Sequence, residues 1–186
     1  MASPGEAEEM NLLKRAIEAY CDPTPKSIQE YLMLFGSARR PEALLDLLEE
    51  IDDRGLFWPT LHQEWTTFDA IPQAEFVKRF RLHRPLWSRD FWSDDERTIF
   101  DALPDPFKAF WGGDASRRPT YCWTLDFAVA KKFALGHRGM RHPKPTVHTA
   151  QIFKSTVCMF LNERNESEVV LFRKPWQSRR KAINEP

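Results

Sequence analysis

The second half of this chain takes its predicted fold from residues 122–134, Cys-Trp-Thr-Leu-Asp-Phe-Ala-Val-Ala-Lys-Lys-Phe-Ala. The apolar side chains of this segment recur at three- and four-residue steps, which predicts a helix over residues 125–135. Either Thr124 or Asp126 can cap the start of this helix, because both side chains accept hydrogen bonds from backbone N–H groups. Gly136 is suited to end it. The segment therefore predicts a short helix with a defined start and a defined end.

Strand-like segments lie on both sides of this helix. Residues 107–111 predict a strand that ends at Gly112-Gly113, and a polar loop with Arg117 and Arg118 follows. After a basic loop with two prolines, β-branched and apolar runs predict three more strands. These runs are Thr146 to Phe153, Thr156 to Leu161 and Glu168 to Phe172.

The first half of the chain is helical by its pattern. Pro25 follows Thr24, a plausible cap, and further apolar faces at helical spacing continue to residue 80. An aromatic stripe within this part is interpreted as core, although a tryptophan stripe can also grip a base or a sugar. Its members are Trp58, Leu61, Trp65 and Phe68. Ser93-Asp94-Asp95-Glu96 has the form of a capping box that starts another helix.

These patterns predict an α+β protein with three parts. The parts are a helical N-terminal region over 1–104 that is expected to pack on the second half, a β-rich region over 105–175 and a basic, mobile tail over 176–186. The sequence does not predict an oligomeric state.

Composition restricts the classes of function. Twenty-seven basic residues balance 27 acidic ones, so the overall charge gives no general attraction to nucleic acid or to an anionic membrane. Cys21, Cys122 and Cys158 lack paired spacing, which favours a reducing cytosol. An acidic N-terminus and the lack of a run of about 18 apolar residues predict a cytoplasmic protein without a membrane span.

Two carboxylates stand at the start of the last predicted strand. If strand alternation extends over residues 166–168, Glu166 and Glu168 point to the same side of the sheet and can converge on one ligand. Neighbouring carboxylates perturb each other's proton affinity, so one can stay ionised while the other donates a proton. In the alternative interpretation, both side chains only solvate the open end of a strand.

Two motifs thus occur in a fixed order, Cys122-Trp123-Thr124 before a helix and Glu166-Ser167-Glu168 before a strand. In this order they resemble the second and third motifs of the ADP-ribosyltransferase family of the Glu-x-Glu type. The resemblance covers residues 107–172 and rests on order and spacing. It implies a small β-sandwich with a crossing helix, NAD as a substrate, and transfer of ADP-ribose to a side chain of a protein acceptor. It also implies a toxin-like or phage-encoded effector that acts on host protein.

The resemblance assigns roles to individual residues. Glu168 would hold a ribose hydroxyl and stabilise the positive charge of an oxocarbenium-like state, and Glu166 would orient or deprotonate the acceptor. Trp123 or Trp111 would stack on the nicotinamide, and Thr124 would bond the ribose or cap the helix.

The sequence departs from the family pattern at two positions. Gly112 stands where the family has an arginine that holds the phosphate and ribose of NAD, and Arg117 or Arg118 can replace that arginine from the following loop. Cys122 stands where the family often has serine, and a thiol is a poorer hydrogen-bond partner than a hydroxyl. The alternative function is a catalytically inactive module that binds a nucleotide or a protein partner.

Two further sites are weighed against this interpretation. Arg138, Arg141 and Lys144, with the arginines of the tail, can bind nucleic acid, but the zero net charge disfavours it. His137, His142 and His148 lack the spacing of metal ligands, so they are interpreted as exposed loop histidines and no metal is expected.

Overall fold

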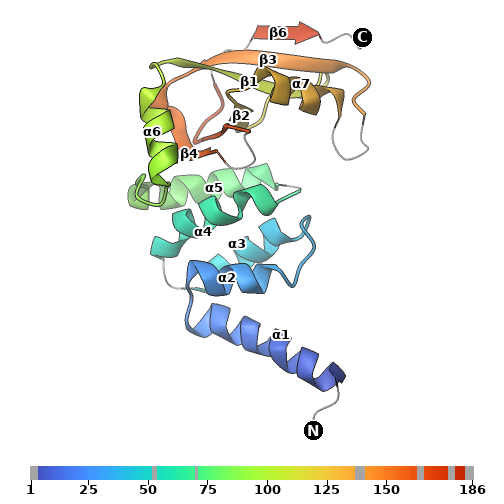
Figure 1. Cartoon of the computed structure of the whole chain (residues 1–186), viewed down its shortest axis with the longest axis vertical. Helices are drawn as coiled ribbons and strands as arrows, with labels where there is room; N and C mark the ends of the chain where they lie inside the picture. Colours follow the sequence, from blue (N-terminus) through green and yellow to red (C-terminus); the bar gives the residue numbers. More distant parts are fainter. Residues whose placement is uncertain are drawn as a thin grey trace. The chain divides into compact units, whose positions relative to one another are not determined.

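The computed structural model shows an α+β protein with two compact units, Met1–Phe91 and Trp92–Pro186 (Figure 1). It describes residues 4–51, 54–69, 71–136, 141–162, 166–175 and 179–182. Within these ranges the chain forms seven α-helices and one six-stranded antiparallel sheet. The boundary between the units lies earlier than residue 104, where the sequence placed it, because the last helix before the sheet packs on the sheet.

The first unit contains helices and no strand in its described residues. Its elements are α1 (Pro4–Cys21), α2 (Pro25–Leu32), α3 (Arg40–Glu50), η1 (Arg54–Leu56), α4 (Phe57–Glu64), η2 (Trp65–Thr67), α5 (Gln73–His83) and η3 (Arg84–Leu86). The start of α2 confirms the predicted cap: the backbone N–H of Ser27 donates to Thr24 Oγ1 at 3.1 Å, and the N–H of Thr24 donates to Ser27 Oγ at 2.9 Å.

The aromatic stripe of the first unit is core. Trp58 and Trp65 are both buried, and Trp58 Nε1 donates to the carbonyl oxygen of His83 at 2.8 Å. The imidazole of His83 in turn stacks on Phe57, with the ring centroids 4.1 Å apart. Because these side chains are enclosed by one another, they hold α4 against α5 and offer no surface to a base or a sugar.

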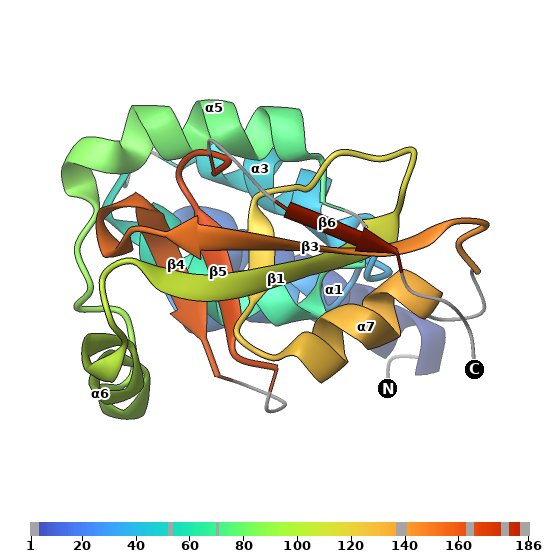
Figure 2. The ribbon, with the colours of Figure 1, turned by 90° about the horizontal axis from the view of Figure 1, so that it is seen from above.

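The second unit contains the sheet, and its strands follow the order β4-β5-β2-β1-β3-β6. Its elements are α6 (Asp94–Ala102), β1 (Phe107–Asp114), β2 (Cys122–Thr124), α7 (Phe127–Leu135), β3 (Pro145–Ile152), η4 (Lys154–Thr156), β4 (Val157–Leu161), β5 (Glu168–Leu171) and β6 (Arg179–Ala182). Figure 2 shows β4 and β5 crossing the direction of β1 and β3, so the sheet is strongly twisted. The described strands thus belong to one twisted sheet, whereas the resemblance implied a sandwich.

The basic tail does not remain outside the fold. Residues 179–182 form β6, which pairs with β3 in the register Thr149↔Arg179 to Thr146↔Ala182. The prediction of a mobile tail was therefore wrong for these residues. The tail carries no apolar alternation that would predict a strand, because all four residues of β6 are exposed.

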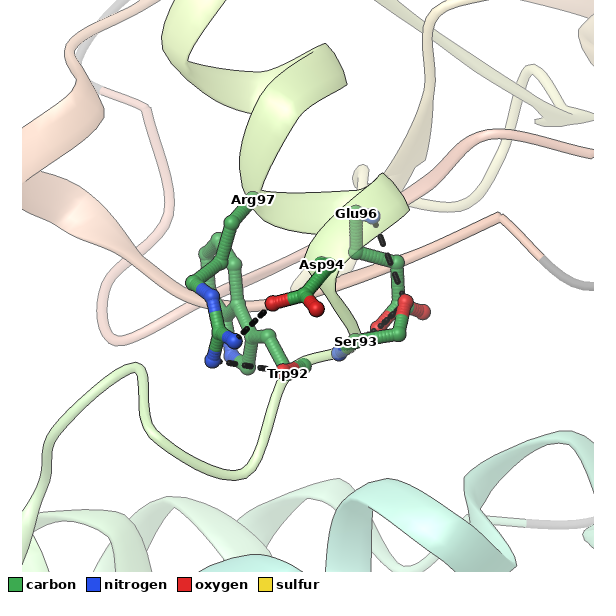
Figure 3. A network of polar contacts seen from close by, with 5 residues as sticks. All are labelled: Trp92, Ser93, Asp94, Glu96 and Arg97. Atoms are coloured by element: carbon green, nitrogen blue, oxygen red, sulfur yellow. Dashed lines mark hydrogen bonds and ion pairs between the residues drawn. The ribbon is translucent and has the colours of Figure 1, made fainter.

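Helix α6 begins at the predicted capping box and belongs to the sheet unit. The N–H of Glu96 donates to Ser93 Oγ at 3.2 Å, and the N–H of Ser93 donates to Glu96 Oε2 at 2.8 Å. Arg97 donates to the carbonyl oxygen of Trp92 at 2.8 Å and pairs with Asp94, as Figure 3 shows.

The aromatic side of α6 then packs on the sheet. The ring of Phe100 contacts Phe107 of β1 and Phe160 of β4, at centroid distances of 6.0 and 5.8 Å. This contact explains why the unit boundary precedes α6.

Helix α7 packs on β1 and β3, and Gly112 makes this possible. A Cβ at Gly112 would lie 1.8 Å from the carbonyl oxygen of Ala130 and 2.9 Å from the backbone nitrogen of Ala134. No side chain fits at this position while α7 stays in place. The sequence predicted that β1 ends at the two glycines. In the structure, β1 continues through both of them to Asp114.

Asp114 ties the end of β1 to the segment before β3. Its carboxylate accepts hydrogen bonds from the hydroxyl of Ser116 at 2.6 Å and from the N–H groups of Ser116 and Lys144 at 2.8 and 2.9 Å. These bonds, in that order, and the charge of His142 lower the pKa of Asp114 from 3.8 to about 2. The bond from Lys144 joins the end of β1 to the residue that precedes β3.

Gly112→Ala should lower the free energy of unfolding by about 3 kcal/mol, because the added methyl meets backbone atoms that cannot rotate away. Gly36→Ala is the matched control, since a Cβ there has no atom within 4 Å, and it should change stability by less than about 0.5 kcal/mol. Urea denaturation followed by circular dichroism measures both. Equal stability of the two variants would contradict the close approach of α7.

Asp114→Asn should destabilise the protein in a pH-dependent way. The folded pKa of about 2 lies below the ordinary 3.8, so the carboxylate stabilises the fold fully above about pH 4 and loses this effect as the pH falls towards 2. The difference in melting temperature between the wild type and the variant should therefore be constant from pH 5 to 7 and narrow below pH 4. A difference that stays constant down to pH 2 would argue against these hydrogen bonds.

Candidate functional site

Three side chains from three neighbouring strands form a row on one face of the sheet. Phe110 of β1 pairs with Thr124 of β2, and Thr124 pairs with Glu168 of β5. Residues directly opposite each other in antiparallel strands point to the same face, and neighbouring strands lie about 4.8 Å apart. The carboxylate of Glu168 is thus placed about two strand spacings from the ring of Phe110. The second and third motifs of the sequence lie next to each other.

The segment that carries the two glutamates is fixed by hydrogen bonds to β2 and to the end of β4. Thr124 Oγ1 donates to the carbonyl oxygen of Glu166 at 2.5 Å, and the N–H of Leu125 donates to the carbonyl oxygen of Ser167 at 3.1 Å. Ser167 Oγ donates to Asn162 Oδ1 at 3.0 Å. Three bonds therefore position the backbone immediately before Glu168.

Asn162 connects this segment to α6. The N–H of Asn162 donates to Glu96 Oε1 at 3.3 Å, while the other oxygen of that buried carboxylate belongs to the capping box. One glutamate thus serves both the start of α6 and the end of β4. The consequence is that the strand end before the candidate site is anchored to a packed helix.

Cys122 contacts Glu168 on the same face. The thiol forms a hydrogen bond with the carboxylate of Glu168, and burial, followed by the negative charge of Glu168, raises the pKa of Cys122 well above its ordinary value. Cys122 therefore stays a neutral thiol at physiological pH, and it is the donor in this bond. The raised pKa disfavours the thiolate, which is the reactive form of cysteine.

The alternation argument does not apply to Glu166. Strand β5 begins at Glu168, and Ser167 has a φ of 43°, which turns the chain just before the strand. Glu166 is half-buried, and Thr124 bonds its backbone carbonyl. The carboxylate of Glu168 is therefore fixed by strand pairing, whereas strand geometry does not place that of Glu166.

Thr124 does not cap the helix. Asp126 is the N-cap of α7, with its Oδ1 accepting from the N–H of Ala128 at 2.6 Å. Thr124 Oγ1 instead accepts from the N–H of Asp126 at 3.1 Å while it donates to Glu166. The hydroxyl of Thr124 thus joins the second motif to the third.

Both candidate tryptophans lie on the other face of the sheet. Trp123 stands between Cys122 and Thr124 on β2, so it points away from Glu168, and only 2% of its surface is exposed. Trp111 is 8% exposed, and its ring covers Gly113. Trp111 Nε1 donates to the hydroxyl of Thr120, and Trp123 Nε1 donates to the carbonyl of Thr120, both at 3.1 Å. The two side chains are core of the second unit.

The two arginines that the sequence offered in place of an arginine at position 112 lie in the loop after β1. Arg117 and Arg118 are both exposed, and neither guanidinium forms a hydrogen bond or an ion pair within the described ranges. The N–H of Arg117 donates to the carbonyl oxygen of Asp114 at 2.9 Å, which fixes the start of the loop. Gly112 itself cannot be replaced by a cation, because α7 occupies the space of its side chain.

Two aromatic residues near Glu168 were not singled out from the sequence. Phe110 is half-buried and Phe127, at the start of α7, is 38% exposed, with the two ring centroids 5.4 Å apart. Both side chains look like core in a one-dimensional pattern. The sequence signal that could have indicated Phe127 is its position only three residues after Thr124 of the second motif.

The remaining sequence hypotheses lie apart from this row. His137 and Arg138 fall outside the described residues, and among those described no group of three His, Cys, Asp or Glu side chains is placed to hold a metal ion. His148 packs edge-on against Trp111, and burial together with the nearby Arg180 lowers the pKa of His148. In the ranges that the structure describes, no helix has the length and apolar character needed to cross a membrane.

Comparison of the chain with models of protein families, with curated proteins and with solved structures gave no significant match.

The contact between Cys122 and Glu168 predicts how the three cysteines react. Cys21, which is exposed, should be alkylated quickly by iodoacetamide at neutral pH, whereas Cys122 should react at least about tenfold more slowly because its thiol is protonated. Glu168→Gln should speed the reaction of Cys122, because removal of the negative charge lowers its pKa.

The buried Cys158, whose thiol donates to the carbonyl oxygen of Val170, is the internal control, and its rate should not change in the variant. Peptide mass spectrometry over a time course measures all three rates. An unchanged rate of Cys122 in Glu168→Gln would show that the two groups do not interact.

Proposed function

We propose that the second unit binds NAD and transfers its ADP-ribose group to a side chain of a protein, with Glu168 as the catalytic carboxylate. The observation that supports this most is the pairing of Thr124 with Glu168 on adjacent strands, ahead of α7. The family that the sequence resembles needs its second and third motifs next to each other, and here a cross-strand pair and the Cys122 contact bring them together. A solvated strand end would need neither contact.

The reaction breaks the bond between nicotinamide and C1′ of the adjoining ribose. Nicotinamide leaves with the bonding electron pair, and its ring loses its positive charge, while the ribose acquires oxocarbenium character. A carboxylate that accepts the ribose hydroxyl stabilises this charge. The acceptor then forms a bond to C1′ and releases a proton. Glu168 is suited to the first role because a neutral thiol donates to it and no second negative charge is added from Cys122.

The flat nicotinamide needs an apolar surface on the same face as Glu168. Phe110 and Phe127 supply this surface in our proposal, in place of the two buried tryptophans. Their rings meet nearly at right angles, at 78°, so one ring can stack on a flat ligand while the other borders it. Arg117 or Arg118 would hold the phosphates from the loop after β1.

Glu166 would act on the acceptor and not on NAD. It lies two residues before the start of β5, and Thr124 bonds its carbonyl, while among the described residues its carboxylate forms no hydrogen bond or ion pair. In this role it orients the acceptor side chain and takes its proton. The acceptor is, in this proposal, a side chain of a host protein, and the enzyme would act as a toxin-like effector.

One observation favours a second candidate, a module of this fold that binds a nucleotide or a protein partner without turnover. The carbonyl of Ala130 fills the space beyond Gly112, so no cation can occupy the position at which the family has its arginine. If neither loop arginine reaches the phosphates, the site keeps its carboxylate and its aromatic pair but does not orient NAD for cleavage.

Release of nicotinamide from NAD by the purified full chain, with and without a host lysate, tests the proposal. Glu168→Gln should lower the rate at least about 100-fold, because it removes charge stabilisation in the transition state. Glu166→Gln should retain hydrolysis of NAD by water and lose transfer to protein, which labelled NAD reveals. Circular dichroism of both variants should match the wild type.

Calorimetry with NAD separates the two candidates. Binding with turnover supports the transferase, and binding without turnover supports the inactive module. If NAD does not bind at millimolar concentration and Glu168→Gln behaves like the wild type, both candidate functions are overturned. The carboxylate of Glu168 is then a structural group.

A further inference from the structure

A basic groove with a volume of about 1320 Å³ lies in the second unit, on the side of the sheet that ends in β6. It is lined by parts of β1, β3 and β6 and by the segment after β5. Its charged lining residues are Lys108, Arg173, Lys174, Arg179, Arg180 and Lys181, and among the described residues no acidic side chain lines it. The groove shares no lining residue with the row around Glu168.

Among the described residues, no anion pairs with the six cations. Within the described residues, none of the six forms an ion pair or a side-chain hydrogen bond. Two of them contact aromatic rings: Lys108 Nζ lies 5.1 Å from the centroid of Phe110, and Lys174 Nζ lies 5.2 Å from that of Tyr121. Like charges gathered in this way repel one another, and a bound polyanion removes the repulsion.

Protection of the sheet edge explains only half of this charge. Basic residues on an edge strand prevent pairing with other chains, and this accounts for Arg179, Arg180 and Lys181 of β6. Lys108 comes from β1, and Arg173 and Lys174 follow β5. Charge from β1 and from the segment after β5 therefore joins that of the edge strand in the same groove, which edge protection does not require.

The rest of the lining suits a nucleotide chain. Phe153 is 56% exposed at the groove, and an exposed aromatic ring beside cations is the usual platform on which a base stacks. Thr149, Gln151 and Thr156 add groups that can donate to phosphate or sugar oxygens. The volume exceeds the roughly 300–1000 Å³ of a site for a small ligand, so an extended ligand fits better than a mononucleotide.

We propose that this groove binds single-stranded nucleic acid, with the six cations on the phosphodiester backbone and a base stacked on Phe153. This goes beyond the proposed reaction with NAD and does not depend on it. The neutral overall composition argued against such binding, but the fold gathers the charge locally. Of the residues that the sequence suggested for this role, the tail arginines line the groove, whereas Lys144 bonds Asp114 through its backbone.

Fluorescence anisotropy of labelled 15-nucleotide strands, oligo(U) RNA and oligo(dT), titrated with the full chain, tests the proposal. Binding should weaken with salt: up to six phosphate contacts give a slope of about −4 in log K against log salt, roughly a 300-fold loss from 50 to 200 mM. Arg179→Glu with Arg180→Glu should weaken binding at least about tenfold. Phe153→Ala should weaken it about five- to 100-fold without changing the salt slope.

Lys131→Glu with Lys132→Glu is the matched control, since it makes the same change of charge on α7, outside the groove. It should alter affinity less than about twofold. Thermal melts confirm that each variant folds, and NAD turnover, measured in parallel, reports separately on the proposed reaction.

Several outcomes would overturn the proposal. No binding at 50 mM salt would do so, as would equal loss of binding in the two charge-reversed double variants. Competition by inorganic polyphosphate as strong as that by oligo(U), combined with no effect of Phe153→Ala, would make the ligand an unspecific polyanion. Binding to vesicles of anionic lipid, without binding to either strand, would assign the groove to a membrane surface.

Discussion

The contact between the backbone of α7 and Gly112 of β1 is the constraint on which the second unit depends. Because Gly112 has no side chain, the carbonyl of Ala130 reaches the strand, and the small residues Ala130 and Ala134 pack beside Val147 of β3. This contact also brings Phe127, at the first turn of α7, against Phe110. The same contact excludes an arginine from position 112. The departure from the family pattern is therefore a consequence of how closely the helix packs, and packing explains it without any reference to catalysis.

A second constraint fixes the carboxylate of Glu168. The register of β5 with β2 sets its face, and hydrogen bonds from Thr124, Leu125 and Ser167 hold the turn before it. Burial keeps Cys122 protonated beside it, so the pair carries at most one negative charge. Strand pairing and these hydrogen bonds therefore set the position of the Glu168 side chain.

Sequence patterns predicted the elements whose signals are local. The caps at Thr24 and Ser93 and the glycine that ends α7 were all confirmed, because hydrogen bonds within a few residues define them. β2 and β6 were missed. β2 is three residues long and β6 is wholly exposed, so neither leaves an apolar alternation. The burial of Trp111 and Trp123 on the face opposite Glu168 was not visible in the sequence, since aromatic type alone does not distinguish a core ring from a ring that binds a ligand.

The amino-acid order was sufficient for the α+β class, the helical first half, and the succession of a Trp-Thr motif, a helix and a glutamate-led strand. These features depend on periodicity and on short-range hydrogen bonds, which the order of residues specifies directly. The pairing of Thr124 with Glu168, the burial of Trp123, and the collection of six cations around β6 depend on which strands become neighbours. Strand neighbours are set by the packing of the whole unit, so a chain with no net charge can still hold a strongly basic groove.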